Sequence, residues 1–285
     1  MKATSLVTVG FVKNFKFWLL GIATGLIAIH LTLTSRGNDA SLLGTSALFW
    51  MAVSSIVWSK RDVLSLDSGF SSSFWGILLI VLVVFKSISV SGYEPFLRIS
   101  PLISALGVAL LASGFKGLKQ YWRELLILCF LVPSPGTLAV LIDISTFTAQ
   151  FANAVLWYLG FEVSRQGVFI NLPTGSIEVY PGCSGIENMF HILGVAVLFL
   201  VMFPTARRTK ILLPVVAMLV AFVINGVRVA VMTVLAASSN PQALNYWHKG
   251  DGSVIFSMIS VLILGVYCLF LLRQSNSENH DSAEF

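Results

Sequence analysis

The sequence predicts an all-α polytopic membrane protein with about eight transmembrane helices. Of its 285 residues, 56% are hydrophobic and only 11% are charged, which is more apolar than a soluble globular domain needs to be. The apolar residues form runs long enough to cross a bilayer, and short polar loops separate these runs. Lipid, rather than a buried core, would therefore solvate most of the apolar surface.

Five spans are expected in an N-terminal region over residues 17–142, after a short basic lead-in. Their ranges are 17–34, 42–58, 74–90, 101–115 and 125–142. Pro133 and Pro135 interrupt the fifth span, which predicts a kink whose freed carbonyls are satisfied by neighbouring helices. A catalytic core over 183–272 holds three more spans, at 186–203, 211–237 and 253–272.

Residues 143–182 are expected at a membrane face, as an interfacial helix followed by a small β-hairpin. Polar residues are spread through 143–160, which ends in Trp157 and Tyr158, and aromatic residues are typical of the membrane interface. A full span there is the alternative. Apolar and polar residues then alternate on both sides of Pro173-Thr174-Gly175, and this period of two about a turn predicts a hairpin.

The basic residues predict the orientation. Twelve of the 18 Lys and Arg residues fall on alternate ends of the eight spans, which predicts the cytoplasmic side. These are Lys2, Lys13, Lys16, Lys60, Arg61, Lys116, Lys119, Arg123, Arg207, Arg208, Lys210 and Arg273. The hairpin and the start of the sixth span then lie on the outer face of a cell's cytoplasmic (inner) membrane. The polar segment 273–285 is expected to be a disordered cytoplasmic tail.

Cys183 is a candidate nucleophile. Cys129 and Cys268 lie inside apolar spans, whereas Cys183 lies in the polar stretch P-G-C-S-G-I-E-N where a long helix begins. Free N–H groups and the helix dipole at such a position favour thiolate over thiol. The alternative is that Pro181-Gly182 forms a turn and that Cys183 is a small apolar side chain.

Two polar residues lie inside the span 211–237. An arginine in the membrane costs about 2.5 kcal/mol or more unless it has a partner or a cavity, so Arg228 is a candidate functional residue. An arginine that reaches the lipid headgroups is the alternative. Asn225 precedes Arg228 by three residues on the same helical face and would also need a partner.

His248 lies in the expected outer loop, where Tyr246 and Trp247 would hold it at the interface. Thiol, guanidinium and imidazole would then meet on one membrane face. Such a set can carry out acyl transfer, with Cys183 as nucleophile, His248 as proton donor and acceptor, and Arg228 stabilising an oxyanion. Glu187 could orient His248 or pair with Arg228.

Other chemistry is disfavoured by the motifs. No H-E-x-x-H motif, zinc-ligand spacing or Walker-type loop occurs, so neither a metal nor a cofactor is expected. The net charge of +5 comes without a basic stripe interleaved with exposed aromatics, which disfavours nucleic acid as a partner. His191, eight residues after Cys183, is too deep to exchange protons with it, and His30 is expected to be a packing or interface residue.

With these residues in hand, the chain resembles the exosortase/archaeosortase family of membrane cysteine transpeptidases. The resemblance depends on Cys183-Ser184-Gly185 at a helix start, Asn225-Gly226-Val227-Arg228 in a later span and Trp247-His248 after it, in that order. The stretches around Cys183 and His248 are similar to the cyanobacterial branch. The similarity to sortases is one of chemistry only, since sortases use the same Cys/His/Arg set on an unrelated fold.

The resemblance implies a sorting enzyme for exported proteins. Its substrates would carry a C-terminal signal of the PEP-CTERM type, consisting of a short Pro-Glu-Pro-like motif, a transmembrane helix and a basic cluster. Cys183 would cleave near that motif through a thioester, and water or an unidentified acceptor at the cell surface would resolve it. Arg228 and His248 carry over as the other catalytic residues.

Two other classes stay open at this point. Gly182-Cys183-Ser184-Gly185 also matches the G-x-S-G of rhomboid-like serine proteases, in which Ser184 would be the nucleophile. That mechanism needs a histidine within a later helix. The second class is a transporter or assembly scaffold in which Arg228 binds an anion or pairs helices.

Overall fold

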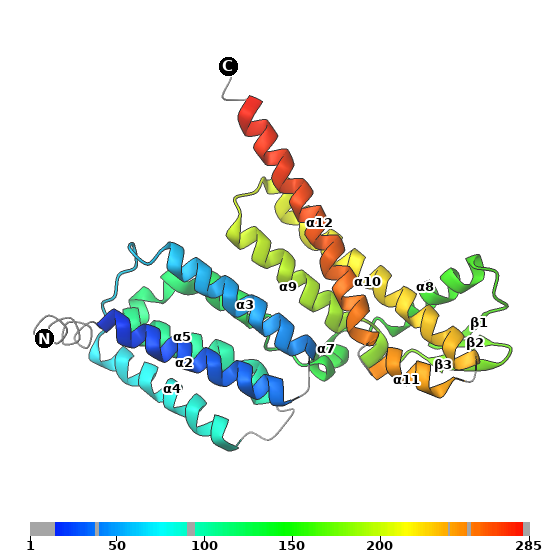
Figure 1. The fold of residues 1–285 in the computed structure, drawn as a ribbon, viewed down its shortest axis with the longest axis horizontal. Helices are drawn as coiled ribbons and strands as arrows, with labels where there is room; N and C mark the ends of the chain where they lie inside the picture. Colours follow the sequence, from blue (N-terminus) through cyan, green and yellow to red (C-terminus); the bar gives the residue numbers. More distant parts are fainter. Residues whose placement is uncertain (1–14, 38–39, 90–94, 239, 250–251, 282–285) are drawn as a thin grey trace, which may run out of the picture. The chain divides into compact units, whose positions relative to one another are not determined.

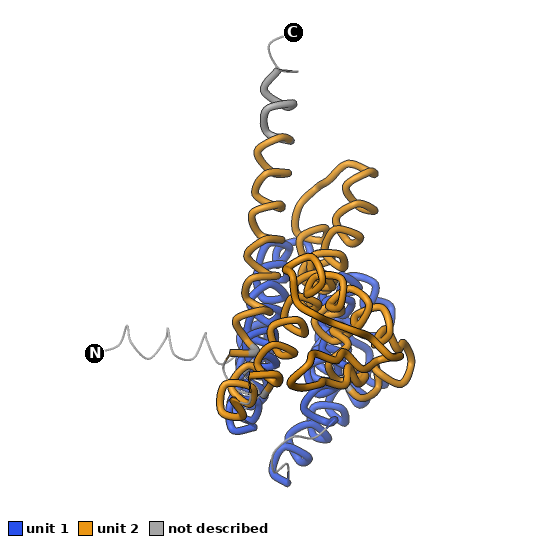
Figure 2. The backbone as a smooth tube through the Cα atoms, turned by 90° about the vertical axis from the view of Figure 1, so that its right-hand side faces the viewer, with its two compact units in different colours: residues 1–132 blue, residues 133–285 orange. Residues whose placement is uncertain are grey.

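The structure is a computed structural model that describes residues 15–37, 40–89, 95–238, 240–249 and 252–281. The basic lead-in before Phe15 lies outside the described residues. The chain divides into two compact units, residues 1–132 and 133–285, which Figure 2 colours separately.

The first unit is a helical bundle. Its helices are α2 (Phe15–Arg36), α3 (Ala40–Ser59), α4 (Phe70–Ser89), α5 (Pro95–Gly117), the 3-10 helix η1 (Leu118–Tyr121) and α6 (Trp122–Cys129) (Figure 1). Helices α4 and α5 pack closely because glycines face each other. A Cβ at Gly76 would lie 2.8 Å from the Gly107 carbonyl oxygen, and such small residues let membrane helices approach.

His30 is a packing residue of this bundle, as predicted. Its ring is buried, the Trp50 indole N–H donates to Nδ1 at 3.1 Å, and Nε2 lies 3.1 Å from the Leu97 carbonyl oxygen. These contacts assign the ring proton to Nε2 and link α2, α3 and α5.

The second unit combines helices with a small sheet. It contains α7 (Pro135–Leu141), α8 (Ser145–Tyr158), β1 (Ser164–Gln166), β2 (Phe169–Leu172), β3 (Gly175–Glu178), the 3-10 turn η2 (Pro181–Cys183), α9 (Ile186–Met202), α10 (Arg207–Ala237), α11 (Pro241–Lys249) and α12 (Gly252–Asp281) (Figure 1). The strands form an antiparallel sheet in the order β1-β2-β3.

Helix α10 is the centre of this unit. Its N-terminal half packs against α9 and α12 through an apolar cluster that includes Leu213, Ala217 and Ala221. Its C-terminal half packs against α8 and the sheet through Val229 and Met232. A Cβ at Gly226 would overlap the Phe151 ring of α8, so this glycine permits the close approach.

The prediction of an all-α polytopic membrane protein is confirmed. Among the described residues, seven helices are long and apolar enough to span a membrane, namely Phe15–Arg36, Ser41–Ser59, Phe70–Ser89, Pro95–Cys129, Pro181–Met202, Arg207–Ala237 and Val254–Gln274. The range Pro95–Cys129 joins α5, η1 and α6 across a kink at Gly114, whose φ is +67°.

The prediction of a continuous fifth span over 125–142 is wrong. The chain instead forms the short helices α6 and α7, separated by turns and irregular backbone over 130–134. Pro133 has no N–H for a helical hydrogen bond. Ser134 then caps α7, since its Oγ accepts from the Thr137 N–H. The proline therefore ends one helix and a new helix starts, where the sequence predicted only a kink.

The segment 143–182 contains the predicted helix and hairpin, with additions. Helix α8 has 14 residues and spans only about 21 Å at 1.5 Å per residue, so it is too short to be the alternative full span. The hairpin is formed by β2 and β3, with Ile170 opposite Ile177, and β1 adds a third strand that was not predicted. The helix α12 continues to Asp281, into the segment predicted to be disordered.

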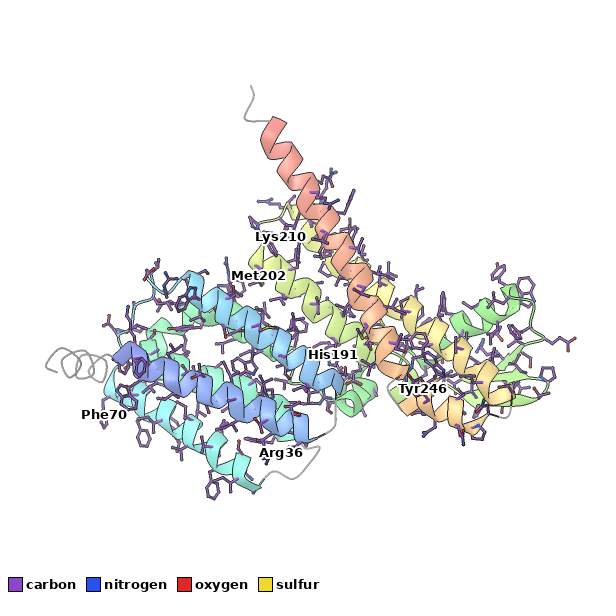
Figure 3. The ribbon with its side chains drawn as sticks, viewed as in Figure 1. Arg36, Phe70, His191, Met202, Lys210 and Tyr246 are labelled. Carbon is purple, nitrogen blue, oxygen red and sulfur yellow. The ribbon has the colours of Figure 1, made fainter. Side chains whose placement is uncertain are left out.

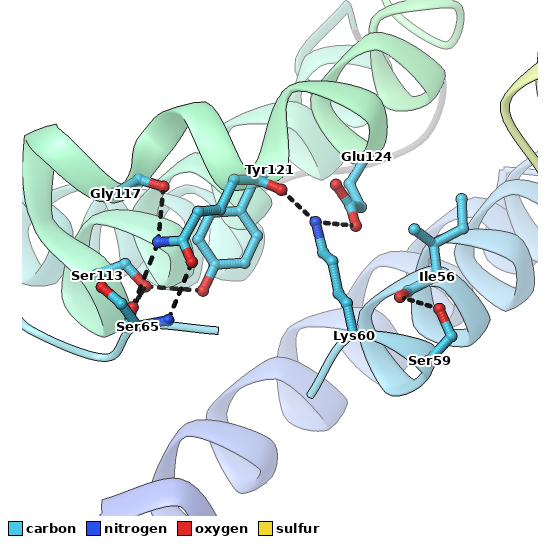
Figure 4. A network of polar contacts seen from close by, with 9 residues as sticks. Ile56, Ser59, Lys60, Ser65, Ser113, Gly117, Tyr121 and Glu124 are labelled. Carbon is cyan, nitrogen blue, oxygen red and sulfur yellow. Dashed lines mark hydrogen bonds and ion pairs between the residues drawn. The ribbon is translucent and has the colours of Figure 1, made fainter. Parts of the chain in front are cut away.

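An ion pair between a partly exposed lysine and a buried glutamate lies at one end of the first unit (Figure 4). Lys60 Nζ is 2.7 Å from Glu124 Oε1, and the Glu124 side chain is 3% exposed. Lys60 also donates to the Gln120 carbonyl, while the Ser113 hydroxyl donates to the Ser65 carbonyl at 2.6 Å. The network therefore connects the end of α3 to η1 and α6.

Lys60→Met should destabilise the protein by about 3 kcal/mol, because it leaves the Glu124 charge buried without its cation. Adding Glu124→Leu should restore much of the loss. Unfolding in mixed micelles measures both changes. Arg61→Met is the matched control, since its partner Asp62 is exposed and such pairs contribute about 0–1 kcal/mol. Equal losses for Lys60→Met and Arg61→Met would contradict the assignment.

Candidate active site

The candidate nucleophile lies on a tight turn between the sheet and α9. Tyr180 is extended, and the 3-10 turn Pro181–Cys183 follows, closed by the Cys183 N–H donating to the Tyr180 carbonyl at 2.8 Å. Gly185 then adopts φ +92° and caps α9. Cys183 is thus three residues before the first residue of the helix, in the turn rather than in its first helical turn.

Side chains hold three carbonyls of this turn. The Asn225 amide donates to the Cys183 carbonyl at 3.0 Å, and the Thr148 hydroxyl donates to the Ser184 carbonyl at 2.7 Å. The Ser184 hydroxyl donates to the Pro181 carbonyl at 2.7 Å. Asn225 and Thr148 are buried, so α10 and α8 fix the backbone around Cys183 from two directions.

Gly185 is required at its position for two reasons. A φ of +92° is a backbone conformation that residues with a Cβ rarely adopt. In addition, a Cβ there would lie 2.5 Å from Asn225 Nδ2 and 2.6 Å from its Cγ. A glycine at position 185 is therefore needed for Asn225 to pack against the turn.

His248 lies next to the thiol. Its Nε2 is 3.2 Å from Cys183 Sγ and 3.1 Å from the Tyr180 hydroxyl. The segment was predicted to be a loop, and this part of the prediction is wrong, because His248 is on the short helix α11. This helix packs on α12 through Trp247, whose ring centroid is 5.7 Å from that of Phe256.

Arg228 contacts the backbone of the histidine. Its Nη2 donates to the His248 carbonyl at 2.9 Å, in the last turn of α11, where helical carbonyls lack intrahelical partners. Cation charge at a helix C-terminus is also favourable. The Nε–H of Arg228 is buried and has no hydrogen-bond partner within the described part of the chain.

Tyr180 is a site residue that the sequence analysis missed. Its hydrogen bond with the Cys183 side chain, its burial and the Cys183 charge together raise the pKa of the phenol to about 12, against the opposing effect of the Arg228 charge. The phenol therefore keeps its proton throughout the physiological range and can act as a donor to sulfur. The sequence shows a tyrosine three residues before the cysteine, but only the folded turn shows that its side chain contacts the thiol.

The remaining candidate residues lie outside the thiol–imidazole contact. Glu187, in the first turn of α9, contributes to the electrostatic environment of Arg228. Ser184 is fully buried, which offers no support for a serine nucleophile. His191 is buried further along α9 (Figure 3). Thr148, like Tyr180, was not predicted as a site residue.

The assembled groups suit acyl transfer. A thiol and an imidazole are within hydrogen-bond distance, and a guanidinium and a phenol surround them. Metal ligands do not gather in the same way: within the described ranges, no group of three or more His, Cys, Asp or Glu side chains could hold a metal ion.

Gly185→Ala should abolish the reactivity of Cys183 toward a small alkylating reagent, because the added Cβ forces Asn225 off the turn. Gly160→Ala is the matched control. Gly160 also has a positive φ, of +86°, but nothing lies within 4 Å of its Cβ position, so only backbone strain of about 1–2 kcal/mol is expected. Equal reactivity of the two variants would show that the Asn225 contact is unimportant.

A comparison with protein families shows which family the chain belongs to. The family model described as transmembrane exosortase matches residues 37–265, which include the turn, Asn225, Arg228 and His248. No match was found among curated proteins or among solved structures. The chain is a multi-pass membrane protein, and it belongs to the transmembrane exosortase family of membrane transpeptidase-type sorting enzymes.

Proposed function

We propose that the protein is a cysteine transpeptidase or protease that cleaves C-terminal sorting signals of exported proteins at the outer face of the cytoplasmic membrane. The observation that carries this proposal is the 3.2 Å contact between Cys183 Sγ and His248 Nε2, since it joins a nucleophile to a general base.

In the first step, the Cys183 thiolate attacks the carbonyl carbon of the scissile peptide bond. A C–S bond forms, and the carbonyl oxygen becomes an oxyanion. Collapse of this intermediate breaks the C–N bond and leaves the substrate as a thioester on Cys183. The amine leaves with the C-terminal part of the signal.

His248 moves the protons. In the ion-pair form, Nε2–H donates to the thiolate, and this proton is then delivered to the leaving amine. In the second step, an amine acceptor or water attacks the thioester. His248 accepts the proton of that nucleophile, the C–S bond breaks and the thiolate returns.

Arg228 has two roles in this mechanism. Through Nη2 it holds the His248 carbonyl, and so it positions the imidazole. Its Nε–H, buried and without a hydrogen-bond partner among the described residues, supplies a charged donor for the oxyanion. A guanidinium suits both tasks because its donors are arranged in a rigid plane.

Tyr180 stabilises the thiolate. Its hydroxyl donates to sulfur while its ring contacts the imidazole edge to face, with centroids 6.1 Å apart. Glu187 balances the Arg228 charge from α9. Asn225 and Ser184 act on the backbone of the turn and not on the substrate.

The proposed substrate is an exported protein with a PEP-CTERM-type signal. Its transmembrane helix would hold the cleavage site near the membrane surface, and its basic cluster would remain in the cytoplasm. The predicted orientation, with the turn at the outer face, matches this arrangement. The acceptor that resolves the thioester would lie at the cell surface.

Cys183→Ala should abolish cleavage of a co-expressed reporter with a Pro-Glu-Pro-type C-terminal signal. His248→Ala should do the same, and Arg228→Lys should lower the rate roughly 10²-fold or more, because lysine cannot serve both acceptors. Reporter size on immunoblots of intact membranes measures cleavage.

Ser184→Ala is the control for these variants, because it removes the neighbouring hydroxyl but not the thiol. It should retain most of the cleavage. Loss of cleavage in Ser184→Ala together with full cleavage in Cys183→Ala would instead support a serine nucleophile. Cleavage that survives in Cys183→Ala would in any case overturn the proposed mechanism.

Tyr180→Phe should shift the pH dependence of Cys183 alkylation to higher pH by about one unit, because a hydrogen bond to the thiolate is lost. The wild-type phenol, with its pKa raised to about 12, donates at every pH tested. The measurement uses a Cys129→Ser, Cys268→Ser background so that one thiol is followed. An unchanged profile would remove Tyr180 from the mechanism, while Tyr158→Phe controls for loss of a phenol elsewhere.

A further inference from the structure

Cys183 and His248 lie on different elements, so the 3.2 Å contact between their side chains depends on how those elements are held together. Cys183 is in the turn before α9, and His248 is on α11, a helix of only nine residues. Helix α10 holds the backbone of both residues through Asn225 and Arg228. A second connection between them runs through α12, which packs on both α9 and α11 (Figure 1).

The second connection starts with a hydrogen bond between α9 and α12. Asn188, in the first turn of α9, donates from its side-chain Nδ2 to Ser260 Oγ at 3.3 Å. Ser260 is fully buried in α12, and its own hydroxyl donates to the Phe256 carbonyl at 3.1 Å. Because the Ser260 proton is used in that bond, its oxygen can only accept, and the amide of Asn188 supplies the donor.

The connection continues from α12 to the helix of the histidine. The Phe256 ring meets the Trp247 ring edge to face, with centroids 5.7 Å apart, and Trp247 directly precedes His248. Gly252 lies at the same junction, because a Cβ there would be 2.8 Å from Trp247 Cε3 and 2.8 Å from Tyr246 Cε1. Both rings therefore pack on the backbone at the start of α12, so a shift of α12 would also move α11.

Apolar contacts also join α9 to α12, but they constrain the two helices less. Ile192 and Leu264 belong to one buried cluster, and apolar burial is not directional. The bond from Asn188 is directional, and Asn188 is only five residues after Cys183. Since hydrogen bonds between membrane helices contribute modestly to stability, the main effect expected of this one is on the geometry next to the turn.

We propose that Asn188 is a positioning residue for the thiol–imidazole pair, acting through Ser260 and α12 on the helix that carries His248. The proposal rests on the proposed function, because it assigns a role in the same reaction. Asn188 acts through other residues and not on the substrate. Without its hydrogen bond, α12 and α11 shift, and Nε2 of His248 moves out of hydrogen-bond distance of sulfur.

The test compares the alkylation rate of Cys183 by a small uncharged reagent at two pH values, in the full-length protein with Cys129→Ser and Cys268→Ser. Near neutral pH the thiolate depends on the neighbouring imidazolium, whereas at about pH 10 an ordinary thiol ionises without it. The ratio of the neutral to the alkaline rate therefore measures the help from His248. Asn188→Leu, of similar shape but without the amide, should lower this ratio roughly fivefold.

This ratio separates positioning from a purely structural role. A change in the access of the reagent to sulfur alters both rates and leaves the ratio as it is. The other titratable groups around the pair, namely Tyr180, Glu187 and Arg228, are unchanged in Asn188→Leu. Thermal unfolding in detergent checks that each variant is folded. An unchanged ratio in folded Asn188→Leu would overturn the proposal.

A double-variant comparison tests whether Asn188 acts through Ser260. Ser260→Ala should lower the ratio by the same factor as Asn188→Leu, and the double variant should lower it no further, because all three lose one bond. Thr233→Val is the control, since it removes a buried hydroxyl that bonds only within α10, to the Val229 carbonyl. It should keep the wild-type ratio. Losses that multiply in the double variant would show that the two side chains act separately and would overturn the proposal.

Gly252→Ala tests the part of the connection between α12 and α11. The added Cβ would displace the rings of Tyr246 and Trp247, so the ratio should fall by a similar factor. Gly265→Ala is the matched control on the same helix, because nothing lies within 4 Å of a Cβ there. Equal ratios in the two glycine variants would show that α12 does not position α11.

The rate ratio does not depend on cleavage, so this proposal and the proposed function fail separately. If the reporter is still cleaved in Cys183→Ala, the proposed function fails, whatever the ratio. If cleavage requires Cys183 but the ratio is unchanged in Asn188→Leu, only the positioning role fails. If both proposals hold, reporter cleavage in Asn188→Leu should fall together with the ratio.

Discussion

The proposed site depends on the conformation of one turn, Pro181–Gly185. A peptide carbonyl inside a membrane protein must find a donor, and the carbonyls of Cys183 and Ser184 find theirs in Asn225 and Thr148. The turn can take this form only because Gly185 has a positive φ and no Cβ. Once it is fixed, the direction of the Cys183 side chain is fixed as well.

Helix α10 holds both members of the thiol–imidazole pair in the same way, by side-chain hydrogen bonds to their backbone carbonyls. Asn225 holds the carbonyl of Cys183, and Arg228, three residues later, holds the carbonyl of His248. Cys183 and His248 are thus each held by a backbone carbonyl, which leaves the side chains available for the proposed chemistry. This arrangement explains why two polar residues occur in an otherwise apolar helix. Their cost in lipid is offset by contacts on the protein side.

The first unit uses its polar residues differently. His30, Trp50 and the Leu97 carbonyl link three helices, and Lys60 with Glu124 joins the end of α3 to α6. These contacts add directional bonds to a bundle in which lipid removes most of the hydrophobic driving force for helix association. The second unit, by contrast, gathers its polar groups around the turn of the proposed site.

The sequence alone determined the membrane class, most of the spans and the hairpin, because these follow from apolar run length and local periodicity. It also singled out Cys183, Arg228 and His248, since polar residues in apolar surroundings are visible in a single chain. Tertiary structure decided the rest. Pro133 separated two helices instead of bending one, and His248 proved to be on α11. The roles of Tyr180 and Thr148 depend on contacts between segments far apart in the chain or folded back by a turn, and such contacts leave no periodic pattern in the sequence.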